Sequence, residues 1–113
     1  MDVSGGFPDG SKFTPVPHLL FGTILERIDD SRVLRCLLRL FWLYHQKDGV
    51  PKFFTIDELM GDRTMLRIIG VDGGSLLDVL NVLGDLGLLL CVNYKSDGDS
   101  GIVYIPNTED GRL

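Results

Sequence analysis

Histidine and cysteine are the residues most often used for metal binding and nucleophilic catalysis, and this chain has two of each. Cys36 and Cys91 lie far apart in apolar runs, without the spacing of zinc ligands. Cys36 and His45 share a predicted helix, but nine positions at about 100° each place them about 180° apart. His18 follows a proline. These residues predict no catalytic and no metal site, and both cysteines are interpreted as small buried side chains of a reducing compartment.

Two glycine-containing segments share single features with known ligand loops. The segment 70–74 precedes a predicted helix, where backbone N–H groups can bind phosphate, but it lacks the lysine and the strand context of the nucleotide motifs. The segment 97–101 has the acids of a calcium loop, but its glycine is misplaced and the glutamate ligand is missing. We therefore expect no cofactor, no small-molecule substrate and no enzymatic activity.

Basic side chains are the remaining chemistry that the sequence offers, because they can contact phosphate or a partner's carboxylates. Three arginines lie along one side of the longest predicted helix, two lie one turn apart on a later helix, and one lysine lies in a predicted hairpin. These candidate contacts are Arg32, Arg35, Arg39, Arg63, Arg67 and Lys95. The arginine stripe is open to three interpretations: phosphate binding, pairing with a second subunit, or a solvated helix face.

Length and charge limit the classes of function. The 113 residues allow one domain, and 11 basic against 16 acidic residues give a net charge of −5. A chain with this balance does not coat nucleic acid by bulk charge, so any DNA binding should be weak and salt-dependent. The sequence predicts neither a secretory signal nor a membrane-spanning run, which favours a cytoplasmic protein without membrane contact.

Apolar periodicity and capping signals predict five helical segments. A short helix is expected at 18–28, and a long one at 30–47, with the segment Asp29-Asp30-Ser31 supplying its N-cap. Thr55 and Glu58 form a capping box that begins a short helix, and a further helical piece is expected at 62–69. The last helix is expected at 75–86, ended by glycine.

Strand signals complete a recognisable order of elements. A short strand is expected at 52–54, and a hairpin at 88–94 and 102–105 with a polar tip at 95–101. Helices followed by a two-stranded wing, with a short strand to pair with it, indicate an α+β fold of mainly helical content: a winged helix, which is a helix-turn-helix variant. The alternative is a small helical bundle with an incidental hairpin. The expected organisation is a flexible N-terminal arm at 1–12, a winged-helix domain at 13–106 and a polar tail at 107–113.

The last helix before the wing would be the recognition helix of a DNA-binding winged helix. Its outward positions are Asp78, Asn81 and Asp85, and the segment 71–87 contains no lysine or arginine. Carboxylates at these positions would repel phosphates, so docking of this helix in the major groove is disfavoured.

The helix expected at 30–47 is apolar on most of its circumference, so it should be central and covered on about three sides. A domain of this size has little structure with which to cover it, which points to a partner or a second copy. The candidate oligomer or partner contacts are Phe13, Val16, Phe21, Trp42 and Tyr44.

Several of these segments together resemble a known family. They are the run Phe13-Thr-Pro-Val-Pro17 before a short helix, the long helix with Phe41-Trp-Leu-Tyr44, and the segments 54–59 and 86–88. In these segments the sequence is similar to the N-terminal winged-helix domain of DnaD-type bacterial replication proteins. The resemblance covers about residues 13–106. It implies a self-association and protein-interaction module of primosome assembly and replication restart, with other replication proteins as partners. The resemblance does not extend to the family's C-terminal DNA-binding domain. The competing hypothesis is a winged-helix transcriptional regulator that binds DNA.

Overall fold

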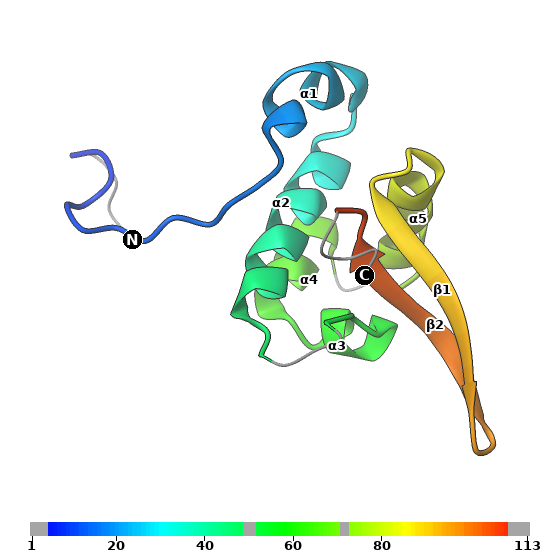
Figure 1. The fold of residues 1–113 in the computed structure, drawn as a ribbon. Helices are drawn as coiled ribbons and strands as arrows, with labels where there is room; N and C mark the ends of the chain where they lie inside the picture. The colour runs from blue at the N-terminus through cyan, green and yellow to red at the C-terminus, as the bar shows by residue number, and fades with distance from the viewer. Residues whose placement is uncertain (1–4, 49–51, 71–72, 109–113) are drawn as a thin grey trace.

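The computed structural model describes residues 5–48, 52–70 and 73–108 and shows an α+β fold (Figure 1). Its elements are η1 (His18–Phe21), α1 (Thr23–Arg27), α2 (Ser31–Gln46), α3 (Ile56–Met60), α4 (Arg63–Ile69), α5 (Gly73–Asp85), β1 (Leu89–Ser96) and β2 (Asp99–Pro106). The predicted fold class is confirmed. The order of α2, a strand bridge, α3 with α4, α5 and the hairpin is that of a winged helix. In the described ranges no helix is both long enough and apolar enough to cross a membrane.

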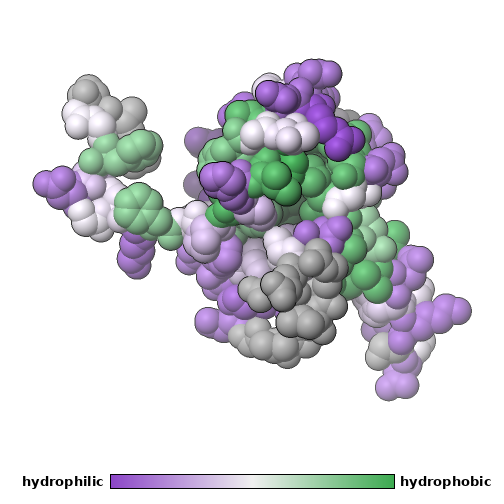
Figure 2. All heavy atoms as spheres, turned by 45° about the horizontal axis from the view of Figure 1, so that its top comes forward, coloured by the Kyte–Doolittle hydropathy of each residue, from purple (hydrophilic) through white to green (hydrophobic). Residues whose placement is uncertain are grey.

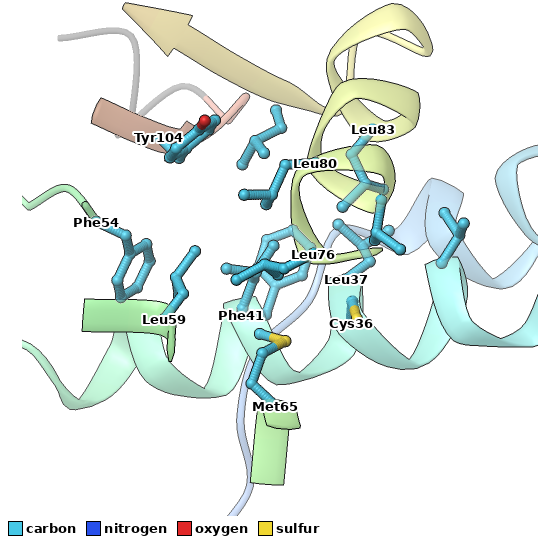
Figure 3. Packing of buried hydrophobic residues seen from close by; sticks show 14 of the residues in the cluster. Cys36, Leu37, Phe41, Phe54, Leu59, Met65, Leu76, Leu80, Leu83 and Tyr104 are labelled. Carbon is cyan, nitrogen blue, oxygen red and sulfur yellow. The ribbon is translucent and has the colours of Figure 1, made fainter. Parts of the chain in front are cut away.

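Helix α2 is the central element, as its composition predicts. The Asp30 side chain accepts a hydrogen bond from the backbone N–H of Arg32 at 2.8 Å, so Asp30 is the N-cap among the three residues that were predicted to supply it. Helices α4 and α5 and strand β2 pack against α2, and its Cys36 and Leu40 are fully buried. Figure 3 shows Leu76 and Leu80 of α5 directed toward this helix. The core is therefore built on α2.

Helix α3 begins with the predicted capping box. The backbone N–H of Glu58 donates to the Thr55 hydroxyl at 3.2 Å, and the Glu58 carboxylate accepts from the backbone N–H of Thr55. Helix α3 ends after one turn, and α4 follows with Asp62 as its N-cap. Residues 71 and 72 of the predicted glycine-containing break lie outside the described residues.

A glycine-dependent cap joins α5 to the wing. Gly87 has a φ of +77°, and the backbone N–H of Leu88 donates to the carbonyl of Leu83 at 3.0 Å. Gly87 donates in the same way to Gly84. This is a Schellman cap, so the predicted stop signal is confirmed, and it turns the chain directly into β1.

The hairpin is longer and its turn shorter than the sequence predicts. Strands β1 and β2 pair antiparallel from Leu89–Pro106 to Ser96–Asp99, so the tip is the two residues Asp97 and Gly98 and not a seven-residue loop. Both have positive φ, as a two-residue hairpin turn requires. Pairing continues past the last apolar residue because backbone hydrogen bonds do not depend on side-chain polarity.

Of the strand predicted at 52–54, only Phe54 pairs with the wing. Its backbone N–H donates to the carbonyl of Tyr104 at 2.9 Å, and Tyr104 donates back to Phe54 at 2.8 Å. The bridge fixes the base of the wing over the core, where both rings are buried.

The N-terminal region divides at Gly22. The helix predicted at 18–28 is instead a 3-10 turn, η1, followed by the five-residue helix α1, because the φ and ψ of Gly22 lie outside the helical region. Before η1 the described part of the predicted arm, residues 5–12, extends away from the body (Figure 1).

Of the predicted polar tail, Asn107 and Thr108 are described, and the Asn107 amide donates to the Gly87 carbonyl at 2.6 Å.

The two cysteines have different surroundings. Cys36 is fully buried, and this burial raises the pKa of its thiol to about 11. Cys91 is exposed, contrary to the prediction, because its strand is the outer strand of the hairpin and borders only the last turn of α5, near Gly84.

This difference gives a direct chemical check of the fold. Under native conditions a thiol reagent should modify one cysteine per chain, Cys91, and should reach Cys36 only on unfolding. Mass spectrometry of the alkylated protein measures the number of modified cysteines per chain. The Cys91→Ser variant should show no rapid modification, whereas rapid modification of that variant would contradict the position given to Cys36.

Candidate interaction surfaces

Large apolar side chains are exposed around the N-terminal elements. Phe13 on the arm is 93% exposed and Phe21 of η1 is 64% exposed, so both predicted contact residues are at the surface. Leu19 of η1 and Leu25 of α1 are exposed beside them. Figure 2 shows the resulting hydrophobic area over η1 and α1, and separate hydrophobic side chains on the arm. Leu19 and Leu25 were part of the predicted helix but not of the predicted contact set.

A groove lies within this area. It has a volume of about 220 Å³, and its apolar lining comes from Pro17, η1, α1, α2 and Leu88, the residue before β1. The lining includes Pro17, Leu19, Leu20, Ile24, Phe41 and Leu88 and no charged residue. The groove can therefore accept an apolar side chain and offers no counter-charge to an ion.

Two predicted contact residues lie deeper. Tyr44 is only 8% exposed and belongs to the core cluster, and Val16 is half-buried against that cluster. A small cavity of about 160 Å³ separates the segment Pro15–Pro17 from Phe41 and Tyr44. Tyr44 is therefore removed from the candidate surface, because the N-terminal segment lies over the side of α2 that carries it.

The outer side of α2 keeps part of its predicted apolar excess. Leu38 and Trp42 are about two-fifths exposed, at 42% and 41%, although most of the helix is covered. The guanidinium of Arg39 stacks on the Trp42 ring, with its Cζ atom 4.1 Å from the ring centroid. Trp42 is thus both partly exposed and held in one orientation.

Arg39 is committed to an interaction within the chain. Its Nε and Nη2 atoms donate to the two carboxylate oxygens of Asp62, at 3.0 and 2.9 Å, and both side chains are mostly buried. These bonds hold the pKa of Asp62 below its ordinary value. The same carboxylate accepts from the backbone N–H of Met65 at 2.9 Å, which caps α4. Arg39 therefore joins α2 to α4 and is removed from the predicted anion-binding set.

The other predicted basic contacts are exposed, and they lie on three elements, α2, α4 and β1. Arg32 pairs locally with Asp30 at 3.5 Å, and Arg35 lies one turn further along α2. Arg63 and Arg67 lie on α4, and within the described residues they form no ion pair. Lys95 lies near the hairpin tip, which projects away from α2 and α4 in Figure 1.

Helix α5 presents acids outward, as predicted. Asp78, Asn81 and Asp85 are exposed, and its buried side is formed by leucines and a valine that pack on α2. Its exposed surface therefore combines negative charge with two exposed apolar residues, Leu77 and Val82.

The outward face of the wing is apolar, which the sequence interpretation missed. Residues directly opposite in an antiparallel pair lie on one face, so the buried pair Leu89–Pro106 and the buried Tyr104, which lies opposite Cys91, mark the core side. The opposite face carries the pairs Leu90–Ile105, Val92–Val103 and Tyr94–Gly101. Val92 and Tyr94 are exposed there. The signal was the unbroken apolar run at 88–92, since continuous rather than alternating runs are typical of strands covered on both faces.

No group of three metal-ligating side chains that could hold an ion occurs among the residues that the structure describes. No family model, no curated protein and no solved structure matches this chain.

Proposed function

We propose that this chain is a non-enzymatic winged-helix domain that associates with itself and with other proteins. The observation that carries the proposal is the character of the two elements with which a winged helix usually contacts DNA. The outward side of α5 is acidic, with Asp78 and Asp85, and the outward face of the wing is apolar. Acids repel phosphates, and an apolar strand face gains nothing from them, whereas both suit contact with protein.

The N-terminal surface supports the same proposal. Four large apolar side chains, Phe13, Leu19, Phe21 and Leu25, are exposed within a short stretch of chain beside an apolar groove. Apolar side chains gathered in this way are typical of protein interfaces, because burying them on association releases ordered water.

The resemblance of residues 13–106 to DnaD-type proteins gives the proposal its setting. We place the domain in the initiation or restart of DNA replication in the cytoplasm, with replication proteins as partners. The second candidate, a DNA-binding regulator, is favoured by the exposed Arg63 and Arg67, which lie one turn apart on α4.

Oligomeric mass and duplex titration together separate the two candidates. At micromolar concentration, light scattering should give at least twice the 12.6 kDa of one chain. A titration of duplex DNA at two salt concentrations should show at most weak binding that falls steeply with salt. A monomer at all concentrations would contradict self-association, and tight duplex binding that depends on Arg63 and Arg67 would favour the regulator.

A further inference from the structure

We propose that the arm of one copy, residues 5–13, binds a second copy by inserting Phe13 into its apolar groove, and that the two copies do so reciprocally. The proposal rests on the self-association proposed above and names the contact that produces it. Its components are the exposed aromatic rings of the arm, the stiffness of the segment behind them, and the groove formed by η1, α1 and α2.

The arm carries aromatic side chains that its own chain does not cover. Phe13 is 93% exposed and Phe7 is 87% exposed, more than any other large apolar residue among those described. The charged residues Asp9 and Lys12 lie between these two rings in the sequence and are exposed. A phenyl ring is among the largest apolar groups that a side chain can bury, so two such rings on a projecting segment provide a strong drive toward a second surface.

The segment behind Phe13 holds it away from its own groove. Pro15 and Pro17 fix their own φ angles and restrict Thr14 and Val16 to extended conformations. In a polyproline-like segment these four residues extend the chain by about 12 Å. Val16 is packed against the core, which anchors the segment at its base. A ring four residues before Pro17 cannot turn back sharply, so the groove of another copy is the favoured destination.

The groove suits a phenyl ring. Apolar cavities of about 150 Å³ can hold a benzene molecule, and this groove has about 220 Å³. Its walls are aliphatic and aromatic, with Asn107 as the polar exception, and no charge lines it. An acidic or phosphorylated ligand would therefore lose hydration without gaining a counter-charge.

Reciprocal exchange doubles the area that one contact buries. A buried phenylalanine removes roughly 150–250 Å² from solvent, so Phe13 of the two arms removes about 300–500 Å². The groove walls that receive the two rings lose a comparable area, which brings the sum to about 600–1,000 Å². Specific dimers bury about 1,200–2,000 Å², so the rest of each arm, including the exposed Phe7, must lie on the surface of the second copy beside the groove.

The first test compares three variants with the unmodified chain by light scattering and sedimentation over a concentration series. Phe13→Ser should raise the dimer dissociation constant at least about a hundredfold, since two rings are lost per dimer. Leu19→Lys, which places a charge in the groove wall, should do the same. Leu77→Lys makes the same change at an exposed leucine of α5 and should leave the constant within about threefold.

Mixing the variants tests whether the arm acts on a second copy. Phe13→Ser keeps the groove and Leu19→Lys keeps the arm, so their mixture should form a heterodimer held by one intact contact, with an affinity between that of the unmodified chain and those of the variants alone. Failure of the mixture to associate, or dimers that survive Phe13→Ser, would overturn the arm contact while leaving self-association in place. A monomeric unmodified chain would overturn both.

Discussion

Replacing Asp62 with alanine should lower the free energy of unfolding by about 2–4 kcal/mol. The carboxylate does two separate things: it caps α4 through the Met65 N–H, and it accepts two hydrogen bonds from Arg39 of α2. Loss of an N-cap costs about 1 kcal/mol, and loss of a charged, largely buried hydrogen-bonding partner costs about 1.5–3 kcal/mol. Chemical denaturation followed by circular dichroism measures the difference.

Matched variants separate the two roles of Asp62. Asp62→Asn keeps a capping oxygen and removes the charge, so its loss of stability should be smaller than that of alanine by about 1 kcal/mol, the contribution of the cap. Arg39→Met removes the ion pair from the other side and keeps the cap. Asp57→Ala removes an exposed acid from the neighbouring helix α3 and should cost less than about 1 kcal/mol. Equal losses for Asp57 and Asp62 would contradict the clamp between α2 and α4.

The stability difference between the unmodified chain and Asp62→Asn should depend on pH. Hydrogen bonds from Arg39 lower the pKa of Asp62 in the folded state, so the folded chain releases this proton more readily than the unfolded chain. The stabilisation is complete above the unfolded pKa of about 3.9 and is lost as the pH falls through the lower, folded pKa. The two denaturation curves should therefore stay apart from pH 7 to about pH 5 and converge below about pH 4. A difference that grows on acidification would contradict this assignment.

The local features of the fold could be predicted because their signals lie within one helical turn. Asp30, the pair Thr55 and Glu58, and Gly87 each act on backbone groups two to five residues away, and all three caps are confirmed. The α+β class followed from the order of such elements.

Features that depend on distant residues could not be predicted in the same way. Arg39 and Asp62 are 23 positions apart, and periodicity shows only that Arg39 lies on a polar stripe. Periodicity likewise shows which side of α2 carries Tyr44 but not that the segment Pro15–Pro17 lies over that side. The exposure of Cys91 depends on its place in the outer strand of the hairpin. Each of these three features depends on which elements pack together, and local sequence signals carry no information about that packing.

The apolar face of the wing is an intermediate case. The sequence contains an unbroken run of apolar residues at 88–92, which indicates a strand with apolar side chains on both of its faces. Only the register, which pairs Val92 with Val103, shows that one set of side chains points away from the core. The sequence therefore shows that the wing has more apolar residues than one face needs, but it does not show where the additional residues lie.

Charge reversal on α5 should raise the affinity for duplex DNA by about tenfold to a hundredfold at low salt. Asp78 and Asp85 lie on the exposed side that would face a major groove, so their change to lysine removes two repulsions and adds two phosphate contacts. Each phosphate contact should steepen the salt dependence by about 0.9 in the slope of log K against log salt, so a slope steeper by about 2 is expected. Fluorescence anisotropy of a labelled duplex at several salt concentrations measures both quantities.

A second double variant shows whether position or total charge is responsible. Glu26→Lys with Asp57→Lys makes the same change in net charge at exposed acids of two other helices, α1 and α3. If α5 is positioned like a recognition helix and only its charge excludes DNA, this control should gain less than about threefold, because only the general attraction to the duplex rises. Equal gains for both variants would mean that α5 has no special access to the duplex. The acids on α5 would then be a solvated face, and the apolar surfaces alone would separate this domain from the DNA-binding winged helices.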